Sequence, residues 1–258
     1  MTEPSSLGCQ ETALPDGRIL LEYESVTSTQ DIALTAVWAG RRDVAAVRSD
    51  HQTAGRGRSG GSWTAEAGTC LLASYILHAG ALQPTDAPQL AFVAAVAAAN
   101  AILTVTGLEV GFKWPNDLLI DGRKLGGILV ETARLPDGSW AAIAGIGVNV
   151  NCIPPELASS AISIRQKLGR TVTISDLEGA VRLELASVFD TYGKHGFAPI
   201  RERWLLSDRT PGMRFQATVN GTLVPGTAVG IEETGALRIQ CDSGELIEVY
   251  SASSLSDL

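Results

Sequence analysis

One apolar stretch, LAFVAAVAAANAILTV at residues 90–105, constrains the fold more than any other part of the chain. It is rich in alanine and is interrupted by Asn100. A helix that is apolar on every side must be covered on every side, and this stretch is shorter than the roughly 20 residues that span a bilayer. We therefore expect a buried core helix and no membrane span. A chain of 258 residues, 45% hydrophobic and 19% charged, can supply the surrounding core.

Short apolar runs separated by turn signals lie on both sides of this stretch. The dipeptide Asp-Gly at 121–122, between two apolar runs, is a strong hairpin signal, and Pro-Asp-Gly at 136–138 marks another turn. The expected strands are residues 18–26, 43–50, 71–77, 110–120, 124–133 and 140–151. We expect an α+β fold, with helices packed on a mixed sheet.

Two further helices are expected. Residues 27–40 form a helical segment in which Ser28 or Thr29 is the N-cap. A longer helix starts near Ser175, because the spacing from Ser175 to Glu178 fits a capping box, and it ends at His-Gly, residues 195–196.

The pattern divides the chain into three parts. We expect a polar N-terminal tail at residues 1–18, a main domain at residues 19–208 and a small β unit at residues 209–258. The last part shows short apolar alternations around three turn dipeptides, Asn-Gly at 220–221, Thr-Gly at 234–235 and Ser-Gly at 243–244.

Charge and cysteine usage exclude several classes of protein. The formal net charge of −8 provides no basic field for nucleic acid or an anionic membrane.

The cysteines, at positions 9, 70, 152 and 241, form no C-x-x-C pair, so we expect reduced thiols and no zinc site. The N-terminus lacks the basic start and apolar run of a signal peptide, and we expect a cytoplasmic location.

The loop AGRGRSGGSW, residues 54–63, spells G-x-G-x-x-G from Gly55 to Gly60. A dinucleotide fingerprint should open a helix and be followed, about twenty positions later, by an acidic residue, whereas a β-rich run follows here and residue 80 is glycine. The chain also has no G-x-x-x-x-G-K-[ST] phosphate loop. Arginines among glycines suit a different anion-binding loop, made of backbone N–H groups and guanidiniums. A solvated surface loop is the alternative.

Four motifs in order resemble the biotin–protein ligase family, the biotin–[acetyl-CoA-carboxylase] ligases. They are STQDIA at 28–33, QTAGRGRSGGSW at 52–63, KWPNDLLIDGRKLGGILVE at 113–131 and GIGVNVN at 145–151. The resemblance implies a biotin/lipoyl ligase-like catalytic domain at residues 19–208 and an SH3-like β-barrel at residues 209–258.

The resemblance also implies the activity. A ligase of this family makes biotinyl-5′-AMP from biotin and ATP with Mg²⁺, and then transfers biotin to a lysine of a biotin carboxyl carrier protein domain. Many bacterial relatives carry an N-terminal helix-turn-helix domain and repress transcription. Only about eighteen residues precede the first expected strand, so we expect the form without that domain and no nucleic-acid partner. The oligomeric state, monomer or homodimer, is left open.

The family's functional residues map onto this sequence by motif. Lys124 and Arg58 are the expected catalytic residues: Lys124 reaches the biotin carboxyl and the phosphate, and Arg58 neutralises the phosphate from the loop. Further biotin contacts are expected at Ser28, Thr29, Gln30, Gln52, Gly55, Arg56, Gly57, Gly127 and Leu129. Further nucleotide contacts are expected at Trp63, Lys113, Asn116 and Asn149. Asp117 is expected on the side of the metal or the acceptor lysine.

Two positions depart from the family pattern. Gln30 stands where the family usually has asparagine, and Gly61 stands where it usually has a second phosphate-directed arginine. The alternative function is a lipoate– or octanoate–protein ligase on the same scaffold. Such an enzyme favours R-R-x-x-G-G-G, whereas here Arg41-Arg42 is followed by DVAA.

Overall fold

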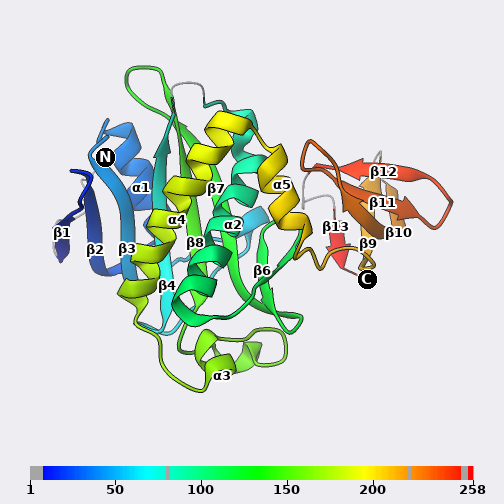
Figure 1. Cartoon of the computed structure of the whole chain (residues 1–258), viewed down its shortest axis with the longest axis horizontal. Helices are drawn as coiled ribbons and strands as arrows, with labels where there is room; N and C mark the ends of the chain where they lie inside the picture. The colour runs from blue at the N-terminus through cyan, green and yellow to red at the C-terminus, as the bar shows by residue number, and fades with distance from the viewer. Residues whose placement is uncertain (1–7, 80–81, 220–221, 251–254, 258) are drawn as a thin grey trace.

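A computed structural model describes residues 8–79, 82–219, 222–250 and 255–257 of the chain. The larger domain is built on an eight-stranded sheet, and a small β domain follows it (Figure 1). From edge to edge the strands of the large sheet are β1 (Cys9–Ala13), β2 (Ile19–Val26), β3 (Val44–Gln52), β4 (Cys70–His78), β8 (Trp140–Asn149), β7 (Arg123–Arg134), β6 (Asp117–Ile120) and β5 (Gly111–Lys113). The pairing of β2 with β3 is parallel and the others are antiparallel, as expected for a mixed sheet.

Helices cover both faces of this sheet (Figure 1). On one face lie α2 (Ala87–Thr106), α4 (Ile174–His195) and α5 (Ala198–Leu205), and on the other lies α1 (Thr29–Trp38). Successive side chains of β4 point to opposite faces of the sheet. Tyr75 packs in the core with α2 and α4, whereas Ile76 packs in the core with α1. A short helix, α3 (Ile164–Leu168), lies before α4.

The predicted core helix is confirmed as α2. By length and composition, α2 with its preceding turn is the one helix of the described residues that could cross a membrane. Most of its apolar side chains, however, are buried in the core and pack against α4 and β7, and Leu103 is the large one that is exposed. The covering that such a helix needs is therefore provided by the protein itself.

The predicted start of α1 and the predicted hairpin are also confirmed. The Ser28 hydroxyl is the N-cap of α1 and accepts a hydrogen bond from the Gln30 backbone N–H at 3.3 Å. Asp121 and Gly122 connect β6 to β7 with φ angles of 50° and 73°. This left-handed backbone favours glycine and tolerates aspartate, which is why the dipeptide predicts the turn.

Three sequence expectations are wrong. The expected strand at residues 110–120 is two antiparallel strands, β5 and β6, joined by a turn at residues 114–116 that contains Pro115. The expected tail contains β1, which pairs antiparallel with β2. Its residues, CQETA, are mostly polar, as in an exposed edge strand, and show no apolar alternation from which a strand could be predicted. The capping box is also absent, because α4 begins at Ile174, so that Ser175 lies inside the first turn. Glu178 instead faces the sheet and pairs with Arg182 at 3.4 Å.

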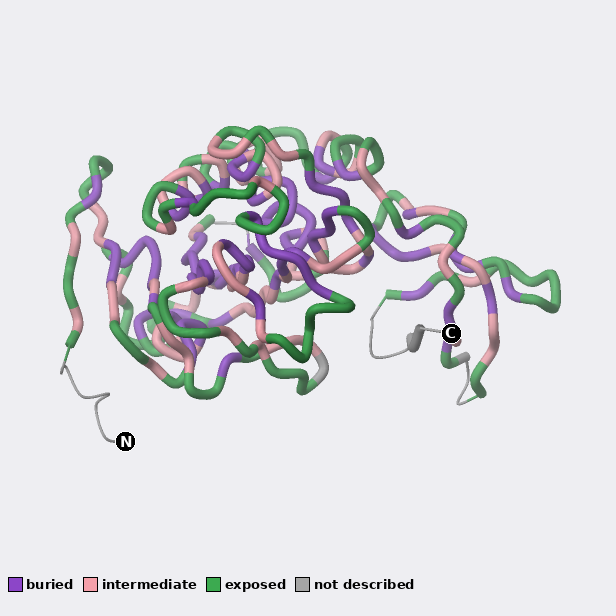
Figure 2. The backbone as a smooth tube through the Cα atoms, turned by 90° about the horizontal axis from the view of Figure 1, so that it is seen from below, coloured by how far each residue is buried: buried purple, intermediate pink, exposed green. Residues whose placement is uncertain are grey.

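The small domain is a five-stranded antiparallel sheet in the order β12-β11-β10-β9-β13. Its strands are β9 (Arg214–Val219), β10 (Thr222–Ile231), β11 (Leu237–Cys241), β12 (Leu246–Val249) and β13 (Leu255–Asp257). This agrees with the expected SH3-like unit, and the turns at 234–235 and 243–244 lie where predicted. The predicted turn at 220–221 lies outside the described residues. Figure 2 shows the buried backbone concentrated in the larger domain, with the small domain beside it.

Candidate active site

Most of the predicted site residues converge on one cavity of about 290 Å³. It lies on the α1 face of the sheet, between the N-terminus of α1, strands β4, β7 and β8, and the glycine-arginine loop. Its lining includes the predicted residues Ser28, Thr29, Gln30, Gln52, Arg56, Gly57, Arg58, Trp63, Asn116, Asp117, Lys124, Gly127 and Leu129. Residues from segments far apart in the sequence therefore form a single site.

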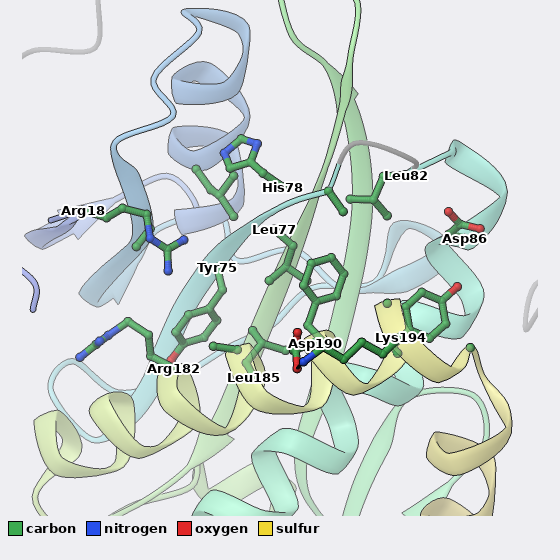
Figure 3. A pocket seen from close by; sticks show the side chains of 18 residues that line it. Arg18, Tyr75, Leu77, His78, Leu82, Asp86, Arg182, Leu185, Asp190 and Lys194 are labelled. Carbon is green, nitrogen blue, oxygen red and sulfur yellow. Dashed lines mark hydrogen bonds and ion pairs between the residues drawn. The ribbon is translucent and has the colours of Figure 1, made fainter. Parts of the chain in front are cut away.

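A larger cavity of about 650 Å³ lies on the opposite face of the sheet, between β4 and α4 (Figure 3). None of the predicted site residues lines it. Arg18 in its wall pairs with Asp16 at 2.7 Å, and Lys194 pairs with Asp190 at 2.7 Å. Size alone would favour this cavity, but the chemistry lies in the smaller one.

One end of the smaller cavity is a buried network of neutral side chains. The Gln52 side-chain oxygen accepts hydrogen bonds from the backbone N–H of Thr29 at 2.8 Å and from its hydroxyl at 3.1 Å. The Gln30 amide donates to the Ile143 carbonyl at 3.1 Å, so the side chain is tied to β8. Thr29 and Gln30 are 4% and 2% exposed. Because these side chains are buried and hydrogen-bonded, their positions are set before a ligand binds.

Ser74 joins this network, and sequence reasoning did not identify it. Its hydroxyl lies 2.9 Å from the Thr29 hydroxyl and donates to the Gln30 side-chain oxygen at 2.9 Å. The signal was a single serine in the apolar run LLASYIL, on the same strand face as Leu72 and Ile76. The Thr29 and Ser74 hydroxyls contact each other, and each also contacts a glutamine side-chain oxygen, that of Gln52 and that of Gln30 respectively. Two hydroxyl protons serve these three contacts, so the hydroxyl oxygens keep lone pairs that can accept a hydrogen bond from a ligand.

Glycines shape the middle of the cavity. A Cβ atom at Gly145 would lie 2.7 Å from the Gln30 side-chain oxygen, and one at Gly147 would lie 2.8 Å from the Trp63 ring. A Cβ atom at Gly55 would collide with the Trp63 carbonyl oxygen. The indole of Trp63 therefore packs directly on the backbone of Gly147, and together with Gly127 it forms an apolar wall of the cavity.

The other end of the cavity is charged. Lys124 on β7 pairs with Asp117 on β6, with Nζ and Oδ1 2.6 Å apart. Arg58 reaches the same end from the loop. Burial lowers the pKa of the Arg58 guanidinium and the negative charge of Asp117 opposes that shift. The Asn116 side-chain amide donates to the Ile128 carbonyl at 2.7 Å and so connects the residue before β6 to β7.

Arg56 connects the loop to both sides of the cavity. Its guanidinium pairs with Asp31 of α1 at 2.8 Å and with Glu131 of β7 at 2.6 Å. The loop is also closed on itself, since the Gly57 N–H donates to the Gly61 carbonyl at 2.7 Å. These contacts hold Arg58 over the cavity.

Three predicted residues lie outside the lining. Gly55 is buried against the Trp63 carbonyl and serves the shape of the loop. The Asn149 amide donates to the carbonyls of Lys124 and Ile162 at 3.4 and 3.3 Å. Lys113 extends towards the small domain, with Nζ 5.9 Å from the centroid of the Phe215 ring. Their expected roles in ligand binding remain predictions.

Comparison with known proteins agrees with this arrangement. A model of the biotin/lipoate A/B protein ligase family matches residues 24–151, and a model of the biotin protein ligase C-terminal domain matches residues 216–253. The bifunctional ligase/repressor BirA of Bacillus subtilis is 35% identical over 242 residues, covering 92% of this chain and 73% of that protein. The chain belongs to the biotin/lipoate A/B protein ligase family. The family resemblance and the prediction of a ligase are confirmed.

Two further proteins show how far the likeness to this family extends. The biotin–[acetyl-CoA-carboxylase] ligase of Paracoccus denitrificans is 34% identical, covering 78% of this chain and 86% of that protein. The structure of a biotin protein ligase from Aquifex aeolicus in complex with biotin and ATP superposes with a TM-score of 0.75. It is 24% identical and covers 92% of this chain and 97% of the other, so it supports the fold.

Proposed function

We propose that this ligase activates biotin with ATP as biotinyl-5′-AMP and transfers the biotinyl group to a lysine of a biotin carboxyl carrier protein domain. The observation that carries the proposal is the polarity of the cavity. A neutral hydrogen-bonding end and a cationic end lie on either side of an apolar middle. Biotin has the same order of groups: a ureido ring, an alkyl chain and a carboxylate.

The neutral end suits the ureido group of biotin. Its N–H groups need acceptors, and Thr29 and Ser74 have spare acceptor capacity. The alkyl chain then lies against Trp63 and Gly127, and the carboxylate points to Lys124. A site that pairs buried polar groups with a ligand rejects analogues without those groups, which favours biotin over lipoate or octanoate.

The cationic end suits the chemistry. A carboxylate does not acylate an amine directly, because oxide is a poor leaving group, whereas the mixed anhydride with AMP has a good one. Lys124 and Arg58 bring the carboxylate and the α-phosphate together and neutralise the charge that develops during attack. When these anions become partners of Lys124, Asp117 is free to bind the ammonium group of the acceptor lysine and take a proton from it, so that the neutral amine attacks the anhydride and AMP leaves.

The residues present also fit a magnesium ion that arrives with ATP. Among the described residues there is no group of three potential metal-binding side chains, and Asp117 is the one carboxylate of the cavity lining. Mg²⁺ is commonly held by one or two carboxylates together with substrate phosphates. Asp117 would hold the ion, which would supply positive charge at the phosphates.

Biotin-dependent release of pyrophosphate from ATP and Mg²⁺ tests the activation step. We expect release with biotin and none when lipoate or octanoate replaces it. Release with octanoate and none with biotin would establish the alternative function.

We also propose that the chain does not bind a biotin-operon operator, because its net charge of −8 opposes association with DNA. A gel shift at moderate salt that depended on biotin and on DNA sequence would contradict this.

A further inference from the structure

Trp114 connects the active-site strands to the small domain. It follows β5 and is 4% exposed. Its backbone N–H donates to the Thr210 hydroxyl at 2.8 Å, and its indole N–H donates to the Gly235 carbonyl at 2.9 Å. Both polar hydrogens of this residue are therefore bonded to residues 209–258, which include the small domain.

The part of the small domain that receives the indole is itself fixed to the larger domain. Arg201 of α5 donates to the Ile231 carbonyl at 2.6 Å and to the Glu232 carbonyl at 3.1 Å. Gln89 of α2 donates to the Thr234 carbonyl at 3.3 Å. Residues 231–235 are thus held by two helices and present the Gly235 carbonyl at a defined place.

On its other side, Trp114 is close in sequence to the reactive groups. Asn116 and Asp117 follow it, and Asp117 pairs with Lys124 at 2.6 Å. Lys113, which precedes it, lies near the Phe215 ring of the small domain. Because residues 114–116 form a short connection between β5 and β6, a displacement of the indole would be transmitted to the Asp117 carboxylate at the start of β6.

We propose that Trp114 is a positioning residue through which residues 231–235 of the small domain set the place of Asp117 and Lys124. No described residue of the small domain lines the cavity, yet the domain acts on the adenylation end through the Trp114 side chain. The neutral end, built on α1, β4 and β8, lies outside this connection. The proposal rests on the proposed function for its assay of adenylate formation.

Trp114→Phe tests this inference. It keeps an aromatic ring but removes the indole N–H, which leaves the Gly235 carbonyl unpaired. We expect adenylate formation at saturating biotin and ATP to slow about tenfold, since small misplacements of reacting groups have large effects on rate. Biotin affinity, measured by calorimetry without ATP, should be unchanged. A structural defect alone would lower both.

Arg201→Lys is the second variant, because lysine cannot reproduce the forked contact with residues 231–232. It should also slow adenylate formation, and the double variant should be no slower than Trp114→Phe alone, because both act through residues 231–235. Trp140→Phe, at a partly buried tryptophan of β8 that lines neither cavity, is the matched control and should leave the rate unchanged.

Three results would overturn the inference. They are an unchanged rate in Trp114→Phe, a parallel loss of rate and biotin affinity, and an equal loss of rate in Trp140→Phe. Absence of adenylate formation in the unmodified protein would instead contradict the proposed function, so the two failures are distinguishable.

Discussion

The two ends of the ligase cavity hold their polar groups by different means. At the neutral end, Thr29 and Gln30 are almost completely buried, and their partners stand on sheet strands. At the charged end, the side chain of Lys124 is 41% exposed and is held by one ion pair with Asp117. A buried network is ordered before a ligand arrives, whereas a partly exposed ion pair can exchange partners at little cost. The neutral end is therefore suited to selecting biotin, and the charged end is suited to the reaction of its carboxylate.

The largest effect is expected at Lys124. Lys124→Met removes the cation that serves both the attacking carboxylate and the phosphate, so adenylate formation should fall by about 10²- to 10³-fold or more. Pyrophosphate release measures this. A variant that still released pyrophosphate at the normal rate would show that the charged end does not perform the reaction.

Arg58→Gly should have a smaller and different effect. It removes one charged hydrogen bond to the phosphate, worth roughly 1.5–3 kcal/mol, so the adenylate should be held about ten- to a hundredfold more weakly. ATP turnover should continue while escaped adenylate modifies bystander lysines. Arg42→Gln, at an arginine paired with Asp137 outside the cavity, is the control and should not leak. Parallel loss of both activities in Arg58→Gly and Lys124→Met would refute this division of roles.

Ser74→Ala tests the neutral end. It removes the hydroxyl shared with Thr29 and Gln30, and loss of about 1 kcal/mol should weaken biotin binding roughly five- to tenfold. The rate at saturating biotin should change little. Ser49→Ala, at a buried serine bonded to the His51 carbonyl, is the matched control. A fall in the saturated rate with unchanged biotin affinity would reverse the roles of the two ends.

The smallest effect is expected at Gly61. Its φ of −65° is accessible to any residue, and it is exposed beside Arg58. Gly61→Arg should slow release of the adenylate by about two- to fivefold, since an exposed charge contributes little. Faster release would indicate that the crowding of a Cβ atom, 3.1 Å from the Arg58 carbonyl, outweighs the added charge.

The sequence predicts those parts of the molecule whose signals are local. The N-cap at Ser28 and the turn at residues 121–122 depend on backbone geometry within a few residues, and both were found. The family motifs also identified most of the lining. Ser74 was missed because one serine in a buried strand is ordinary, and only the neighbouring α1 makes it part of a network.

Other features depend on partners outside the segment itself. Strand β1 forms on the edge of β2, a short turn away in the chain, and its own polar residues give no strand signal. Lys113 and Asn149 belong to the motifs, yet tertiary contacts direct them to Phe215 and to the Lys124 carbonyl. A motif therefore indicates which residues lie near the site, and the fold decides which of them line it.

The mass of a carrier domain after incubation with this protein, biotin, ATP and Mg²⁺ tests the proposed ligase most directly. We expect the addition of one biotinyl group, and no addition when the acceptor lysine of the carrier is replaced by arginine. A carrier that stays unmodified here, although another biotin ligase modifies the same preparation, would contradict the proposed function.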